Sequence, residues 1–169
     1  MITLILGGAR SGKSSVAETR ATQAAGPAGG VTYIATIWPT ESGPDADLDA
    51  RVAAHRAGRP SSWATVEPPY ELCDVLAATT GVVLLDSLGS WLTAQPDMNV
   101  DRDSVASALA ARSEPTIVVS DEVGWGVHPE SAIGRQFRDE LGSLNRAVAD
   151  VADDVLVVVA GRILRTDRP

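Results

Sequence analysis

Short runs of aliphatic and β-branched residues recur along the chain, and segments long enough to form helices separate them. Such runs, bounded by turn signals, are typical of strands that are buried on both faces of a parallel sheet. The pattern therefore predicts an α/β fold with a mostly parallel central sheet flanked by helices. The expected strands are Ile2–Leu6, Val31–Ala35, Val82–Leu85, Ile117–Val119 and Val155–Val159.

Helical periodicity is clearest over Ile133–Ala152, where apolar residues step by four and three positions along one face. Lys13–Ala25 and Asp101–Arg112 are also expected to be helices, and Asp47–Gly58 shows a less regular helical pattern. The irregular stretches between these elements are expected to be loops or lids. They are Trp38–Pro44, Gln95–Asn99 and Glu122–Glu130.

Composition narrows the function classes. A chain of 169 residues with 44% hydrophobic and 21% charged residues fits one folded domain over residues 1–169. The net charge of −8 argues against binding to a nucleic-acid backbone, and the apolar runs are too short to insert into a membrane. The first residues lack a basic, apolar leader, which favours a cytoplasmic protein. The single cysteine, Cys73, has no partner for a disulfide and is interpreted as a packing residue.

A phosphate-binding loop follows the first expected strand and precedes a helix, which is the setting that this motif requires. Its glycines let successive backbone N–H groups approach phosphate oxygens, and the helix that follows adds a positive end of its dipole. The pattern G-x-x-x-x-G-K-[ST] predicts a site for a nucleoside triphosphate with Mg²⁺. The loop is Gly7, Gly8, Ala9, Arg10, Ser11, Gly12, Lys13 and Ser14.

Lys13 is the only lysine in a chain that otherwise uses arginine, so a compact point charge is needed at this position. We expect Lys13 to reach the β- and γ-phosphates and the Ser14 hydroxyl to bind Mg²⁺. A second Mg²⁺ ligand should lie at the end of a neighbouring strand. Asp86 is favoured because it ends an uninterrupted apolar run; a helix N-cap is its other interpretation. Asp121 and Glu122 follow a serine, and the alternative role for them is to position water or a substrate hydroxyl.

His55 lies among three arginines within four residues, an unusual setting in an acidic protein. Arginines beside a histidine can hold a triphosphate, keep the imidazole neutral and leave a ring nitrogen free to attack phosphorus. The residues alone leave two interpretations open: a nucleophile or phosphate ligand, and a solvated helix face rich in arginine. His128, beside Pro129, is interpreted as structural.

In these features the chain resembles the bifunctional adenosylcobinamide kinase/adenosylcobinamide-phosphate guanylyltransferase family of cobalamin biosynthesis. The matching segments occur in the family's order and span most of the chain. They are Gly7–Ser14, Tyr33–Thr36, Arg51–Pro60, Trp63–Glu67, Leu84–Leu92, Ser120–Pro129 and Arg135–Asn145.

The resemblance implies a P-loop NTPase of RecA-like fold that assembles as a homotrimer. It implies that ATP or GTP phosphorylates a hydroxyl of adenosylcobinamide, a corrinoid, and that GMP then passes from GTP to this phosphate. His55 matches the histidine that carries GMP between GTP and the corrinoid phosphate. The nucleotide contacts that the resemblance implies are Ala35, Thr36, Ile37, Arg56, Ala57, Gly58, Arg59, Glu67 and Asp86.

The sequence departs from the family pattern near the expected substrate side. Asp121 stands where the family usually has Asn, and Ser87-Leu88-Gly89 stands where it often has Cys-Leu-Thr. Two other functions stay open at this point. One is a P-loop small-molecule kinase without a covalent GMP step, and the other is a nucleotide-dependent switch protein in which Glu122–Pro129 forms the switch loop.

Overall fold

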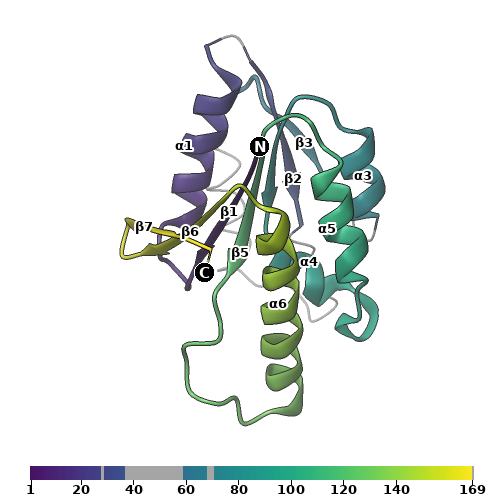
Figure 1. Ribbon diagram of the computed structural model, residues 1–169, viewed down its shortest axis with the longest axis vertical. Coiled ribbons are helices and arrows are strands. Elements are labelled where there is room, and N and C mark those ends of the chain that lie inside the picture. The colour runs from purple at the N-terminus through teal and green to yellow at the C-terminus, as the bar shows by residue number, and fades with distance from the viewer. Residues whose placement is uncertain (28, 37–58, 68–70, 169) are drawn as a thin grey trace.

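The computed structural model describes residues 1–27, 29–36, 59–67 and 71–168, and its centre is a twisted sheet with helices on both faces (Figure 1). In the described residues the sheet has seven strands in the order β3-β2-β4-β5-β1-β6-β7. All neighbouring pairs are parallel except β6 with β7, which is antiparallel. The expected mostly parallel α/β fold is confirmed.

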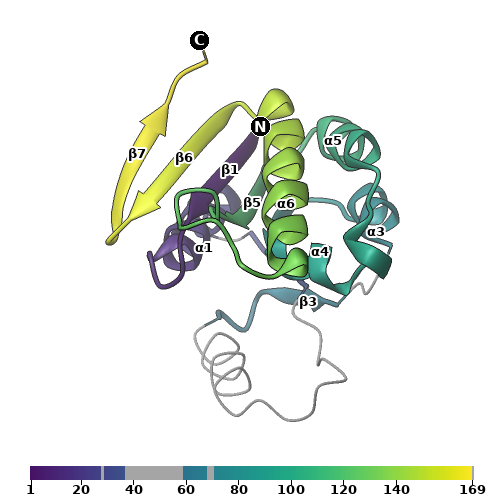
Figure 2. The ribbon, with the colours of Figure 1, turned by 90° about the horizontal axis from the view of Figure 1, so that it is seen from below.

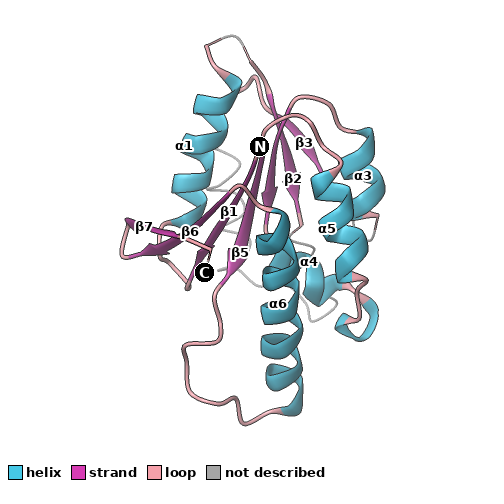
Figure 3. Cartoon of the chain, in the orientation of Figure 1, coloured by secondary structure: helices cyan, strands magenta, loops and turns pink. Residues whose placement is uncertain are grey.

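All five expected strands are present, and two more strands extend the sheet at its edges (Figure 3). The two additions escaped the sequence analysis because β3 has only three residues and β7 is exposed along its whole length and carries two arginines. A turn at Ala160 and Gly161, both with positive φ, returns the chain from β6 to β7. The strands are β1 Ile2–Gly7, β2 Val31–Ala35, β3 Ala64–Val66, β4 Val82–Asp86, β5 Thr116–Asp121, β6 Asp154–Val159 and β7 Arg162–Thr166.

The three helices with regular periodicity also lie where they are expected. Two helices of seven residues each, α3 and α4, were missed because two turns are too short to display a period. Gln95–Asn99 contains a short 3₁₀ turn, η1, whereas Asp47–Gly58 and Trp38–Pro44 lie outside the described residues. The helices are α1 Lys13–Ala25, α3 Leu72–Ala78, α4 Leu88–Ala94, α5 Arg102–Ala110 and α6 Ala132–Val151, with η1 Pro96–Met98.

Each face of the sheet has its own core because consecutive strand residues point to opposite sides. Leu4 and Leu85 pack with residues of α3, α4, α5 and α6, whereas Ile5 and Leu84 pack on the other face with residues of α1. All four side chains are fully buried. Burial on both faces explains why these strands are continuous apolar runs rather than alternating ones. None of the described helices combines the length and apolar character needed to cross a membrane.

The parallel strands bring their carboxyl ends to one edge of the sheet. Gly7 at the end of β1 pairs in register with Asp121 at the end of β5, and Ala35 at the end of β2 pairs with Asp86 at the end of β4. Seen along this edge, the N-terminus of α1 and the loop that follows β5 lie close to the ends of the strands (Figure 2). Ligands bind at this edge in open α/β sheets, so the functional residues are sought there.

Candidate active site

The phosphate-binding loop is shaped by two glycines. Gly12 adopts φ +94° at the N-cap of α1, a left-handed conformation that favours glycine. A Cβ at Gly7 would lie 2.5 Å from Ser11 Oγ and 2.7 Å from the Val158 carbonyl oxygen, so no side chain fits there. Because no side chain caps α1, the N–H groups of its first turn remain available to an anion. The loop therefore has the form that phosphate binding requires.

Lys13 is held over this loop by two oxygen atoms. Its ammonium nitrogen lies 2.8 Å from Asp121 Oδ1 and donates to the Gly8 carbonyl oxygen at 3.3 Å. The Lys13 side chain is only 13% exposed, which strengthens the ion pair relative to one in open solvent. A bound γ-phosphate in contact with Lys13 would consequently lie near the Asp121 carboxylate. The sequence singled out both residues but did not predict that they pair.

Asp121 sits in a tightly packed position at the end of β5. Its backbone carbonyl accepts a hydrogen bond from Asn145 Nδ2 at 3.1 Å, and a Cβ at Gly89 would lie 2.7 Å from Asp121 Oδ2. Gly89, in the first turn of α4, thus leaves the space that the carboxylate occupies. The next residue, Glu122, donates its backbone N–H to the Gly7 carbonyl oxygen at 3.1 Å, which joins the loop after β5 to the phosphate-binding loop.

Asp86 has a different kind of partner. The buried Tyr33 hydroxyl donates to Asp86 Oδ2 at 2.8 Å, and the Arg59 guanidinium carbon lies 3.3 Å from the centre of the Tyr33 ring. Burial, followed by the neighbouring Asp86 charge, raises the pKa of Tyr33 above its usual value. The phenol therefore remains a neutral donor to Asp86 at physiological pH. Tyr33 links two residues that were predicted separately, Asp86 and Arg59.

Thr36 ties the ends of β2 and β4 together. Its hydroxyl donates to the Ser87 carbonyl oxygen at 2.6 Å and accepts from the Ser87 backbone N–H at 2.7 Å. Its own N–H donates to the Asp86 carbonyl oxygen at 3.2 Å. These contacts occupy the buried Thr36 hydroxyl, so its observed role is to fix the backbone beside Asp86.

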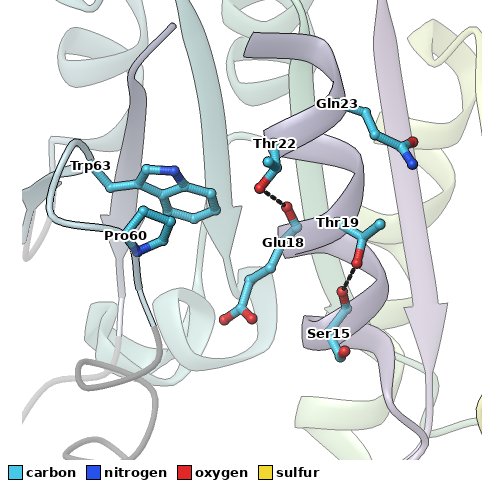
Figure 4. A pocket seen from close by; sticks show the side chains of 7 residues that line it. All are labelled: Ser15, Glu18, Thr19, Thr22, Gln23, Pro60 and Trp63. Atoms are coloured by element: carbon cyan, nitrogen blue, oxygen red, sulfur yellow. Dashed lines mark hydrogen bonds between the residues drawn. The ribbon is translucent and has the colours of Figure 1, made fainter. Parts of the chain in front are cut away.

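Two adjoining cavities lie beside Arg59 and Trp63. The first, of about 440 Å³, is lined by Arg59 and Glu67 together with residues of the connecting segment, Pro60–Thr65. The second, of about 340 Å³, lies between Pro60 and Trp63 on one side and α1 on the other, where Glu18 and Thr22 face Trp63 (Figure 4). The structure thus brings Arg59 and Glu67, both expected nucleotide contacts, to one concave surface.

Most of the predicted site residues fall into three groups. The phosphate-binding loop and Asp121 form one cluster, and Asp86, Tyr33 and Arg59 form a second cluster along the same edge of the sheet. His128 is exposed and contacts Arg138, with 2.9 Å between His128 Nδ1 and a guanidinium nitrogen; its structural role stays a prediction. The third group lies outside the described residues and consists of Ile37, His55, Arg56, Ala57 and Gly58.

Comparison with known proteins identifies relatives along nearly the whole chain. The family model described as cobinamide kinase / cobinamide phosphate guanyltransferase matches residues 3–166. The bifunctional adenosylcobalamin biosynthesis protein CobP of Pseudomonas aeruginosa is 39% identical over 95% of this chain and 94% of its own length. The corresponding CobU protein of Escherichia coli is 34% identical over 95% of this chain and 97% of its own length.

Solved structures with little sequence similarity share the fold. A KaiC-like protein from Pyrococcus horikoshii aligns with a TM-score of 0.53 at 17% identity, over 92% of this chain and 69% of its own. The flagellar accessory protein FlaH from Methanocaldococcus jannaschii aligns with a TM-score of 0.51 at 14% identity, over 96% of this chain and 74% of its own. These alignments confirm the expected fold class, that of P-loop NTPases. Sequence, fold and phosphate-binding loop agree that this chain is a transferase of the cobinamide kinase / cobinamide phosphate guanyltransferase family.

Proposed function

We propose that the protein phosphorylates the free hydroxyl of adenosylcobinamide with ATP or GTP and then transfers GMP from GTP to the new phosphate, giving adenosylcobinamide-GDP. The observation that carries this proposal is the Lys13–Asp121 pair over a complete phosphate-binding loop, in a chain that matches the family from residue 3 to residue 166. A homotrimer and a cytoplasmic location stay predictions from the resemblance and from the sequence.

In the kinase step, the loop residues hold the triphosphate and orient its γ-phosphorus toward the acceptor hydroxyl. The hydroxyl oxygen gives up its proton to water and forms a bond to the γ-phosphorus, the bond from this phosphorus to the β-phosphate oxygen breaks, and the nucleoside diphosphate leaves. Backbone N–H groups of residues 8–14 and the Lys13 ammonium stabilise the charge on the transferring phosphoryl group and on the leaving diphosphate. Lys13 must for this purpose move from Asp121 toward the phosphate or contact both at once.

In the guanylyl step, a neutral ring nitrogen of His55 attacks the α-phosphorus of GTP and pyrophosphate leaves. The phosphate of the corrinoid then displaces the histidine and takes up GMP. The covalent intermediate divides one difficult displacement into two easier ones. The assignment of His55 is supported by its arginine-rich sequence and by the resemblance. Arg59, at the end of that segment, stacks on Tyr33 beside Asp86, and Glu67 lines the same cavity as Arg59.

The residues at this edge fit a magnesium ion bound to the nucleotide. Mg²⁺ prefers a few protein oxygens together with phosphate oxygens and water, and Ser14 and Asp86 supply one hydroxyl and one carboxylate. The Asp86 carboxylate is only partly buried, and its described hydrogen-bond donor, Tyr33, is neutral, so its negative charge is not cancelled by that contact. When bound, the ion would neutralise phosphate charge, and Ser14 and Asp86 would hold it.

The first test is the intact mass of the protein after incubation with GTP and Mg²⁺. We expect a mass increase of one GMP that is labile to acid, absent from His55→Ala, and discharged by adenosylcobinamide phosphate. His128→Ala is the matched control, because it removes the other histidine and should still form the adduct. A folded wild-type protein that binds GTP without forming an adduct would contradict the covalent step and leave the simple kinase and the switch protein as alternatives.

A further inference from the structure

Three exposed apolar side chains lie within nine residues that follow β5 and enter α6. Trp125 is 72% exposed and Val127 is 95% exposed in the loop of residues 122–131, and Ile133, in the first turn of α6, is 67% exposed. Exposed apolar side chains that lie close together in the chain mark a binding site more often than single exposed residues do. In the described part of the chain, a second such group consists of Val159, Ile163 and Leu164, which are less exposed, at 45%, 45% and 57%.

The loop that carries these side chains is held by polar contacts. Glu122 accepts a hydrogen bond from the Gly124 N–H at 2.6 Å, which closes the loop at its start. Arg135 donates to the carbonyl oxygens of Pro129 and Glu130, and Arg138 contacts His128, which fixes its end to α6. These contacts position the backbone while the apolar side chains remain exposed. The loop backbone is therefore held at both ends while these side chains face solvent.

These side chains follow the site of phosphoryl transfer closely in the chain. The loop starts at Asp121, which pairs with Lys13, and at Glu122, whose N–H donates to the Gly7 carbonyl oxygen. Trp125 follows Asp121 by four residues, so its Cα lies within about 14 Å of the Asp121 Cα. Figure 1 shows the loop extending from the end of β5 to the start of α6. A substrate with its hydroxyl beside Lys13 would place an attached group over this loop.

We propose that Trp125, Val127 and Ile133 form the surface on which the corrin ring of the acceptor rests while its hydroxyl arm reaches the phosphate-binding loop. This inference rests on the proposed function. A corrin is a broad macrocycle with apolar faces and a rim of amide groups, which suits a flat aromatic side chain flanked by aliphatic ones. Glu130, exposed on the same loop, offers a carboxylate to rim amides. A second copy of this chain is the competing occupant.

The test is a titration of wild type and Trp125→Ala with cobinamide. Binding is measured by the quenching of tryptophan fluorescence and by the absorbance of the corrinoid. We expect Trp125→Ala to weaken cobinamide binding about tenfold, and Trp125→Phe to recover most of the affinity because it keeps an aromatic face. ATP affinity should not change. Leu164→Ala is the matched control, because Leu164 is 57% exposed on β7, the third strand from β5 in the sheet, and its loss should leave cobinamide binding unchanged.

Each contrary outcome has its own meaning. Equal cobinamide affinity in wild type and Trp125→Ala would overturn this inference while leaving the proposed function intact. A lower oligomeric mass of Trp125→Ala in sedimentation, with unchanged cobinamide affinity, would overturn it in favour of a second copy of this chain. A wild type that binds ATP but neither binds nor phosphorylates cobinamide would overturn both this inference and the proposed function.

Discussion

Two carboxylates end neighbouring strands at the same edge of the sheet, yet their partners differ. Asp86, at the end of β4, accepts a hydrogen bond from the neutral phenol of Tyr33, whereas Asp121, at the end of β5, forms an ion pair with Lys13. A carboxylate whose charge is offset by an ammonium is a weaker ligand for a cation than one that faces a neutral donor. The difference supports the proposal that Asp86, rather than Asp121, is the carboxylate that would bind the magnesium ion, because Asp121 pairs with Lys13.

The largest effect is expected when Lys13, the partner of Asp121, is replaced. Lys13→Ala should lower the rate of phosphoryl transfer by about 10³-fold, because it removes the ammonium that is proposed to stabilise the transferring phosphoryl group. Single-turnover kinetics with ATP and cobinamide would measure this loss. Lys13→Arg is the informative control, since it keeps the charge but replaces a compact ammonium by a planar fork. A Lys13→Arg enzyme with a near-normal rate would show that charge alone is sufficient.

The two carboxylates themselves should respond unequally. Asp86→Asn should lower the rate by about 10²-fold and raise the Mg²⁺ concentration needed for half-maximal activity, because a direct ligand loses its charge. Asp121→Asn should change the rate by less than about tenfold, since an amide oxygen can still accept from Lys13. Rates measured over a series of Mg²⁺ concentrations separate the two variants. If both variants need the same Mg²⁺ concentration for half-maximal activity, Asp86 and Asp121 do not differ as ligands for Mg²⁺.

The sequence predicted the residues of this site better than their partnerships. The phosphate-binding loop Gly7–Ser14 could be predicted from the sequence around it, because the strand, the glycine-rich turn and the helix follow one another in the chain. The pairing of Lys13 with Asp121 and of Tyr33 with Asp86 depends on which strands become neighbours, and strand order is not a local property. A related reason explains the missed strands. β3 has only three residues and β7 is exposed along its length, so neither forms the long apolar run of a buried strand, and both depend on pairing with a neighbouring strand at a sheet edge.

A smaller effect is expected when the space beside Asp121 is filled. A Cβ at Gly89 would lie 2.7 Å from Asp121 Oδ2, so Gly89→Ala should displace the carboxylate from Lys13 and lower the rate by a few-fold. Gly142→Ala is the matched control, because Gly142 also lies in a helix and has open space beside it, so alanine should be neutral or stabilising there. A double-mutant cycle with Asp121→Ala tests the cause. If Gly89→Ala lowers the rate equally in the Asp121→Ala background, its effect arises from packing against other residues.

The smallest effect concerns the neutral partner of Asp86. Tyr33→Phe removes one buried hydroxyl and its hydrogen bond, which should lower the free energy of unfolding by about 1 kcal/mol at neutral pH. The raised pKa of Tyr33 adds a pH dependence. Above about pH 10 an unfolded tyrosine loses its proton while the folded Tyr33 keeps it, so wild-type stability should fall there as pH rises. Urea unfolding from pH 8 to pH 11 would measure this fall.

Because phenylalanine cannot ionise, Tyr33→Phe should lack this part of the alkaline loss, and the stability difference between the two proteins should shrink as pH rises above about 10. Tyr70 and the arginines are present in both proteins and cancel in the comparison. A stability difference that stays constant over the whole range would mean that Tyr33 ionises as easily in the folded protein as in the unfolded one. Asp86 would then face a phenolate at alkaline pH, and repulsion between two anions would replace the hydrogen bond that distinguishes it from Asp121.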